Sequence, residues 1–478
     1  MFKSKYFFWI IICALCSPII SCKVPAIQTQ NTTLKMPEYV GTDSLDSISW
    51  GTISWKTFFQ DKYLADLIDT ALVNNKELKI TLQDIEIAKN DINFKRSKIY
   101  PQVGLKVGTG VEKVGRYTSQ GAGDASTEIT AGKEMPDPLP DFGIAATANW
   151  EVDIWHKLKN AEVAAQNHYF ATVEGKNFVL TNLIAEVANT YYELVMLDNQ
   201  LKIVQDNREL QKRALEVVKA QKEVGKVNEL AVQKFTVELL KTEGIAYKIQ
   251  QDIVETENEL NFLLGRFPQK IKRNSESLMG NFPATIHTGF SSSLLHNRPD
   301  IKEAELELKA ANLDVKVARA EFFPSLDISA ALGLQAFKPS YLVKLPESML
   351  YSLAGDLFAP LLNKGAIKAE FNTANARQIQ VLYDYEQKVL NAYMEVSNQM
   401  ANIDNIDQEL SKQQKQVDIL NNSIDISKDL FLNNRAEYLE VLTTQKDVLE
   451  SKLDLYELKK NKYTAMVQLY KALGGGWK

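Results

Sequence analysis

The chain has little cysteine and, beyond its first residues, no long hydrophobic run. All 3 cysteines lie within the first 22 of its 478 residues. The rest of the sequence therefore excludes a disulfide framework, a zinc–thiolate site and a cysteine nucleophile. No later apolar stretch reaches the roughly 20 residues that a membrane-spanning helix needs. If the chain crosses a membrane, we expect β-strands to do so, because only helices and closed barrels satisfy their backbone groups in lipid.

Glycine and proline are scarce in two long segments. Residues 155–224 contain no proline and only Gly175, and residues 364–433 contain no proline and only Gly365. Apolar residues in the first segment recur every three or four positions, which indicates a helix with one buried stripe. About 70 helical residues span roughly 105 Å. Rods of that length predict a coiled-coil-like assembly rather than globular domains.

Signatures of catalysis and of nucleic-acid binding are also missing. The 55 basic and 60 acidic residues give a formal net charge of -5, which argues against nucleic acid as a partner. None of the 4 histidines lies in a zinc-binding or triad-like motif. The glycines near residue 108 lack the spacing of a phosphate-binding loop. We therefore expect no enzyme activity, no metal site and no bound cofactor.

The N-terminus has the pattern of a cleaved signal. Lys3 and Lys5 precede an apolar run from residue 6 to residue 20, which is too short to span a bilayer. The residues Ile19-Ile20-Ser21-Cys22 resemble the lipobox of bacterial lipoproteins. This resemblance predicts a signal peptide over 1–21 and a mature chain that begins at an acylated, palmitate-bearing Cys22. The alternative is an ordinary signal peptide with an incidental cysteine.

The chain also resembles itself. At an offset of 223 residues, Pro101 aligns with Pro324 and Arg96 with Arg319; at an offset of 209, Glu186 aligns with Glu395. We interpret this as two structural repeats over 22–297 and 298–478, with about 14 extra residues in the polar loop 116–140 of the first. A shared helical composition is the alternative explanation.

Each repeat is expected to run helix, strand, strand, long helix, helix. The first helix is predicted over 61–98, and the returning helices over 229–264 and 438–473. Alternating apolar and polar residues predict four strands, at about 102–115, 141–154, 325–336 and 349–360. This alternation fits a membrane β-barrel and equally a half-buried soluble sheet. Trp150 and Trp155 suit either a membrane interface or a packed core.

Several short motifs resemble one known family. They are Asn297-Arg298-Pro299-Asp300-Ile301 with Ala304-Glu305, Phe323-Pro324-Ser325-Leu326, Trp150-Glu151-Val152-Asp153-Ile154 and Tyr438-Leu439-Glu440-Val441-Leu442. With these, nearly all of the mature chain resembles the TolC-like outer-membrane efflux proteins, in their lipoprotein branch. The resemblance implies a mainly α fold with a β-barrel part. It also implies a homotrimer whose twelve-stranded outer-membrane barrel continues as a periplasmic α-helical barrel.

The same resemblance implies a function and partners. Family members act as the passive exit duct of tripartite pumps, in which a periplasmic adaptor (membrane fusion) protein joins the duct to an inner-membrane transporter. Four strands per chain cannot close alone, since bacterial barrels begin at eight strands, so copies sharing one barrel agree with this function. The alternative is a lipid-tethered coiled-coil spacer without a pore. The sequence does not identify the cargo.

The resemblance also selects candidate gate residues. The family often has an acid shortly after the second helical turn, and Glu440 matches that position. A second acid common three residues later is replaced by Thr443. Asp425 and Asp429, one helical turn apart before the tip, are further candidates for an acidic ring that selects cations. The alternative for all three acids is a solvated helix face.

The two helical turns are candidate adaptor-docking sites. They contain Gly225 and Lys226 in the first repeat, and Asn434 and Arg435 in the second. Glycine suits the left-handed backbone that such turns need, and asparagine tolerates it better than most residues. The alternative is that these residues only terminate helices.

Overall fold

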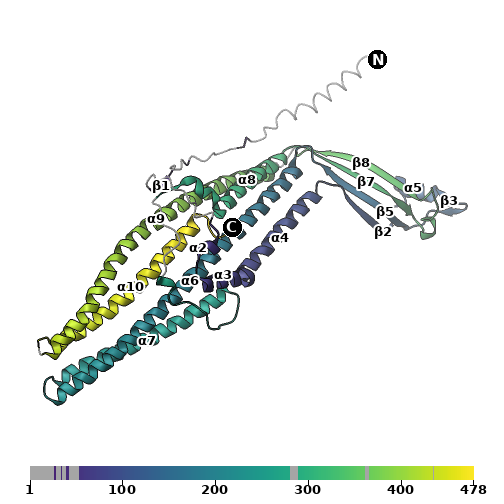
Figure 1. The fold of residues 1–478 in the computed structure, drawn as a ribbon. Coiled ribbons are helices and arrows are strands. Elements are labelled where there is room, and N and C mark those ends of the chain that lie inside the picture. Colours follow the sequence, from purple (N-terminus) through teal and green to yellow (C-terminus); the bar gives the residue numbers. More distant parts are fainter. Residues whose placement is uncertain are drawn as a thin grey trace. The chain divides into compact units, whose positions relative to one another are not determined.

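The computed structural model describes residues 26–27, 34, 39–41, 53–279, 289–360, 365–433 and 435–477. The predicted signal peptide, Cys22 and Asn434 lie outside the described residues. The elements in Figure 1 are β1 (Tyr39–Gly41), α2 (Trp55–Phe58), α3 (Lys62–Asn74), α4 (Lys76–Ser97), β2 (Gln102–Glu112), α5 (Ser119–Ser126), β3 (Glu128–Thr130), β4 (Lys133–Glu134), β5 (Leu139–Val152), α6 (Lys157–Glu223), α7 (Glu229–Leu263), η3 (Ser277–Met279), β6 (Gly289–Ser291), η4 (Ser292–Asn297), α8 (Pro299–Ala320), β7 (Ser325–Ala336), η5 (Pro339–Tyr341), β8 (Met349–Phe358), α9 (Gly365–Leu432) and α10 (Tyr438–Ala472).

The chain forms two compact units. From residue 53 onward, the first unit takes residues 87–169 and 306–382, and the second takes 53–86, 170–305 and 383–477. Each unit thus combines segments from both expected repeats. The division into repeats therefore stays a prediction about internal similarity and does not describe separate compact bodies.

The first unit contains a four-stranded antiparallel sheet with strand order β2-β5-β7-β8 (Figure 1). Its strands lie within the segments whose alternation predicted them, except that β5 begins at Leu139 instead of residue 141. In the described part of the chain, β2 and β8 each pair with one strand only. Both outer edges of the sheet therefore present unpaired backbone groups.

One face of this sheet is apolar and exposed. The register aligns Leu105, Ala146, Leu332 and Tyr351 in one row across the four strands. The exposed fractions of Leu105, Leu332 and Tyr351 are 71%, 60% and 79%. A contiguous apolar surface of this kind is unfavourable in water and marks a contact with lipid or protein.

The polar segment 116–140 is more ordered than the loop that its composition suggested. Helix α5 begins after Thr118, whose hydroxyl accepts a hydrogen bond from the Gly121 amide at 3.1 Å. Strands β3 and β4 then pair as an antiparallel hairpin. The expectation of an irregular loop was therefore wrong, because the caps and turns that order this segment use the same small polar residues that occur in loops.

The expected single helix over 61–98 is two helices, α3 and α4. Asn75 lies between them with extended backbone angles (φ -53°, ψ 134°). Its side-chain amide donates to the Leu263 carbonyl at 2.9 Å, and its side-chain oxygen accepts from the Leu78 amide at 2.9 Å. The break therefore depends on a contact with a distant segment, which a local hydrophobic period does not reveal.

The second unit has one large apolar core. It collects buried side chains from α2, α3, α6, α7, α9 and α10, among them Leu64, Tyr191, Leu260, Val396 and Met466. Phe58 stacks on Tyr470 with ring centroids 4.1 Å apart. Burial of large apolar side chains is the main favourable contribution to folding here, at about 1.5–3 kcal/mol each.

The long helices occur where the scarcity of glycine and proline predicted them. Helix α6 has 67 residues and α9 has 68, and α7 and α10 follow them after short turns (Figure 1). Among the described residues, no helix combines the length and the apolarity that crossing a membrane requires.

We expect Asn75→Ala to destabilise the start of α4. The substitution removes the acceptor of the Leu78 amide and the donor to Leu263, and loss of a helix cap costs about 1 kcal/mol. Hydrogen exchange of the Leu78 amide measures this local opening. Asn90→Ala, at an exposed position of α4, is the matched control; equal exchange in both variants would contradict the capping role.

Candidate functional site

Helix α6 ends in a glycine turn. Gly225 has a φ of 75°, and the Lys226 amide donates back to the Gln221 carbonyl at 2.9 Å. Asn228 then starts α7 by accepting a hydrogen bond from the Ala231 amide at 3.1 Å. The turn therefore has the left-handed conformation expected at Gly225, which other residues adopt only with strain. We name residues 224–228 the first tip turn.

Helix α9 ends differently. The Asn433 side chain donates to the Asp429 carbonyl at 2.8 Å, and the Arg435 amide donates to the Leu430 carbonyl at 2.8 Å. Helix α10 begins after Glu437, whose side chain makes no capping bond. These contacts satisfy carbonyls at the end of α9. We name residues 433–437 the second tip turn, of which Asn434 is not described.

The two tip turns share one apolar cluster. Leu215, Val218, Ala231, Phe235 and Leu442 are buried together, and Phe431 and Tyr438 pack against them. An open hollow between the turns is lined by Gln221, Gly225, Lys226, Val227, Asn228, Phe431, Ala436, Glu437 and Tyr438. The structure therefore brings the predicted docking residues Gly225 and Lys226 next to the second tip turn.

The candidate gate acids are all exposed in the single chain. Glu440 lies in the first turn of α10, where the helix dipole favours a carboxylate. Asp425 and Asp429 lie in the last two turns of α9. Among the described residues, none of these three acids forms an ion pair with a basic side chain. Their role as a ring stays a prediction, because a ring requires further copies of the chain.

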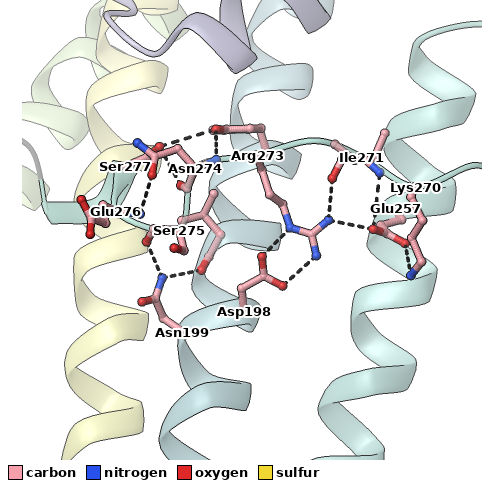
Figure 2. Close-up of polar contacts among 12 residues, drawn as sticks. Asp198, Asn199, Glu257, Lys270, Ile271, Arg273, Asn274, Ser275, Glu276 and Ser277 are labelled. Carbon is pink, nitrogen blue, oxygen red and sulfur yellow. Dashed lines mark hydrogen bonds and ion pairs between the residues drawn. The ribbon is translucent and has the colours of Figure 1, made fainter.

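A polar network crosses the second unit where the segment after α7 passes over α6 (Figure 2). The Arg273 guanidinium donates to Asp198 at 2.7 Å and to Glu257 at 2.7 Å. Lys270 donates to the other oxygen of Glu257 at 3.0 Å. One largely buried arginine thus joins α6 and α7 to the segment that follows α7.

The charged groups in this network change one another's pKa values. Burial alone would raise the pKa of Glu257, but hydrogen bonds from Arg273 and Lys270 outweigh it and hold the pKa below its usual value. Burial alone would lower the pKa of Arg273, and its bonds to Asp198 and Glu257 raise it instead. Because each charge has a close partner, the attraction between the charges offsets the cost of burying them.

A second buried arginine explains one of the family-like motifs. The Arg298 side chain, 5% exposed, forms a two-point contact with Asp300 at 3.0 and 2.8 Å. It also donates to Glu395 at 2.8 Å and to the Ala472 carbonyl at 3.0 Å. These bonds outweigh the effect of burial and raise the pKa of Arg298. The motif therefore joins the start of α8 to α9 and to the end of α10.

The polar face of the sheet holds an acidic row that the sequence did not reveal. Glu151 lies opposite Asp327, and Asp327 lies opposite Asp356. Carboxylates directly opposite each other repel, at a cost of about 0.2–1 kcal/mol per pair. The three residues are far apart in sequence, so only the strand register brings them together.

The two tryptophans both use their indole N–H groups in the first unit. Trp150 donates to the Ile99 carbonyl at 2.9 Å, and Trp155 donates to the Pro324 carbonyl at 2.8 Å. Trp155 also stacks on Phe323 with ring centroids 4.8 Å apart. These contacts fix the junctions between the sheet strands and the adjoining segments.

We expect Arg298→Met to destabilise the start of α8 by about 3 kcal/mol. The substitution leaves Asp300 as a buried charge without its partner, which is the costly way to break an ion pair. Hydrogen exchange of the α8 amides measures the loss. Arg213→Met removes an exposed arginine and serves as the control; an equal effect in both variants would mean that the buried network contributes nothing specific.

The pH dependence of stability should report the contact of His168 with α8. The neighbouring carboxylates of Asp314, at 3.8 Å, and Glu307, at 3.0 Å, raise the pKa of His168 from 6.5 to about 10. A raised pKa stabilises the fold fully below pH 6.5, and this contribution disappears as the pH rises to about 10. The thermal midpoint of the wild type should therefore exceed that of His168→Ala at pH 6, and the gap should shrink toward pH 10. His296→Ala, at an exposed position, should show no such trend.

Comparisons with known proteins agree with this architecture. The sequence profile of the outer membrane efflux protein family matches residues 67–266 and 290–475. The chain is 28% identical over 433 residues to the probable outer membrane lipoprotein SilC of Salmonella typhimurium, which covers 90% of this chain and 89% of SilC. It is 29% identical over 425 residues to the cation efflux system protein CusC of Escherichia coli K12, covering 88% of each.

Solved structures give the same result. A crystal structure of CusC superposes with a TM-score of 0.81 at 27% identity, and covers 95% of this chain and 100% of CusC. The outer membrane protein VceC of Vibrio cholerae superposes with a TM-score of 0.78 at 21% identity, over 90% of this chain and 100% of VceC, and shows the shared fold. From its profile, its relatives and its fold together, the chain belongs to the outer membrane efflux protein family.

Proposed function

We propose that this outer-membrane efflux protein is the exit duct of a tripartite pump and conducts cargo passively through a pore that three copies build together. A periplasmic adaptor protein and an inner-membrane transporter are the proposed partners. The match to the efflux family over most of the chain carries the proposal. A duct of this kind needs a polar passage and a gate, and no catalytic group.

The sheet supports a barrel shared between copies. Its exposed apolar face suits hydrocarbon, and its polar face suits water. The unpaired edges of β2 and β8 would cost several kcal/mol per backbone group in lipid. Pairing β2 of one copy with β8 of the next removes both edges, and three copies of four strands give a twelve-stranded barrel.

A stripe on α7 supports the same association. Leu230, Val237, Leu240, Tyr247 and Val254 are all exposed, by 44% to 74%. Their spacing places them on one helix face, opposite the buried Ala246, Ile249 and Ile253. We propose that this α7 stripe packs against another copy.

The relatives support efflux without selecting a cargo. CusC is named for cations, OpmQ of Pseudomonas aeruginosa for pyoverdine and SrpC of Pseudomonas putida for solvents. All three are 27% to 29% identical to this chain. The proposed duct therefore takes its cargo class from the transporter to which it is coupled.

Three further roles are proposed for individual residues. Cys22 carries the lipid that anchors the mature chain in the outer membrane, as a covalent group and not a cofactor. Gly225, Lys226, Asn434 and Arg435 form the surface that docks the adaptor. Glu440, with Asp425 and Asp429, forms the acidic gate. The hollow between the two tip turns supports the docking role, since it offers polar and apolar groups together.

The native mass of the detergent-extracted protein tests the shared barrel. We expect three times the mass of the mature chain, and a stable monomer would contradict the proposal. Tyr247→Glu places a charge on the α7 stripe and should weaken the trimer. Gln250→Glu adds the same charge at an exposed position beside the stripe, and should leave the trimer intact.

The acidic gate predicts a change in ion selectivity. Glu440→Gln removes one carboxylate per copy, so the cation-to-anion permeability ratio of the reconstituted pore should fall at least twofold. Bilayer recordings with a salt gradient measure this ratio. Glu457→Gln, an exposed site farther along α10, is the matched control; an unchanged ratio in Glu440→Gln would exclude this acid from the gate.

A further inference from the structure

The second unit has two apolar clusters that are not continuous. The cluster shared by the tip turns, which we call the tip cluster, reaches Leu215 on α6, Phe235 on α7 and Leu442 on α10. The main core resumes at Val204 on α6 and at Ala246 on α7. On α10 it resumes at Leu449. All three helices therefore leave a gap between the clusters.

The buried side chains in this gap are polar on α6 and α7, and on α10 a polar one lies near the apolar Val448. The polar ones are Asn207 and Gln211 on α6, Thr242 on α7 and Gln445 on α10, with exposed fractions of 6%, 1%, 0% and 8%. We call these four residues the polar layer. Side chains this well buried occupy core positions rather than a solvated face.

The spacing along α6 places the layer in the helix seam. Val204, Asn207, Gln211, Leu215 and Val218 follow one another in steps of three or four residues, so they share one face of the helix. Val204 belongs to the main core, whereas Leu215 and Val218 belong to the tip cluster. Asn207 and Gln211 are thus polar residues within an otherwise apolar seam.

Contacts between the helices put the layer at one level. Lys222 at the end of α6 pairs with Glu229 at the start of α7, across the first tip turn. The two helices are antiparallel, so Thr242, 13 residues after Glu229, lies level with residue 209, which is 13 residues before Lys222. Thr242 is therefore between the levels of Asn207 and Gln211. Gln200 donates to the Leu453 carbonyl of α10 at 3.3 Å. Moving seven residues toward the tip leads from Gln200 to Asn207 on α6 and from Leu453 to residue 446 on α10. Asn207 therefore lies level with residue 446, next to Gln445.

Several polar atoms in the layer lack partners. Both side-chain atoms of Gln211, the Thr242 hydroxyl and the side-chain oxygens of Asn207 and Gln445 are buried without a hydrogen bond from any described residue. Burying such groups unsatisfied is unfavourable. These unpartnered groups lower the local stability of the helices at the level of the polar layer, between the two apolar clusters.

We propose that the polar layer is a joint. The tip-side segments, residues 212–223 of α6, 229–241 of α7 and 438–444 of α10, open together as one cooperative unit while the main core stays packed. Segments of low local stability open in such units. A role of this joint as a gate rests on the duct function proposed above. The local opening itself is a property of the fold and does not depend on that function.

Hydrogen exchange of the full-length protein in detergent tests the joint directly. In the wild type, tip-side amides should exchange at one common rate, at least tenfold faster than amides of the same helices on the core side. The triple variant Gln211→Leu, Thr242→Val and Gln445→Leu replaces three of the four polar side chains of the layer, and should slow tip-side exchange at least tenfold. Gln205→Leu, at an exposed position of α6, is the control and should change nothing.

Two single variants keep the test decisive if the triple variant does not fold. Thr242→Val preserves shape and should slow tip-side exchange, whereas Leu215→Gln extends the layer and should accelerate it. Two results would overturn the joint. One is tip-side exchange in the wild type that is as slow as core-side exchange. The other is tip-side exchange that stays unchanged in the variants that fold. Slowed exchange with fewer open channels supports the joint as a gate; slowed exchange in a protein that forms no pore would end the duct proposal and leave the joint standing.

Discussion

Backbone hydrogen bonding at the edges of one sheet constrains the whole molecule. A four-stranded sheet with an apolar face cannot satisfy β2 and β8 within a single chain, and lipid offers no alternative partner. The proposed sharing of one barrel between copies answers that constraint, and the exposed stripe on α7 is a second surface that such copies could cover. The single chain therefore leaves two strand edges and two apolar surfaces without a partner among the described residues.

The second unit distributes its stability unevenly. Arg273 and Arg298 each join three segments through buried, charge-assisted hydrogen bonds, and both lie beside the main apolar core. Toward the tip turns the packing changes to a small apolar cluster behind a polar layer. The character of the packing thus changes along the same continuous helices, from a large apolar core to a polar layer and a small apolar cluster.

Local patterns predicted the elements well, because strands and helices leave periodic traces. The alternation around Val103 and Leu105 located β2, and the scarcity of glycine and proline located α6 and α9. The break at Asn75 was missed, since its cause is the Leu263 carbonyl on a distant helix. The ordered insertion around α5 was missed because its caps look like loop residues.

In the candidate site, the role of a residue could be predicted from sequence only where it depends on the backbone conformation of that residue alone. Gly225 could be assigned to a left-handed turn from its type and place alone. The partners of Arg298, by contrast, are known only once α8, α9 and α10 are packed. The polar layer required the register of three helices, because asparagine, glutamine and threonine look in sequence like ordinary surface residues.

The acidic row on the sheet has an electrostatic consequence of its own. Glu151, Asp327 and Asp356 are held side by side by strand register, so the chain cannot relieve their repulsion by moving them apart. Lys157 gives Glu151 one fixed counter-charge at 2.5 Å, and mobile cations within a screening length of about 8 Å at physiological ionic strength balance the rest. A solute that approaches this level of the polar face meets a local excess of dissolved cations, and an anionic solute must displace part of that ionic atmosphere.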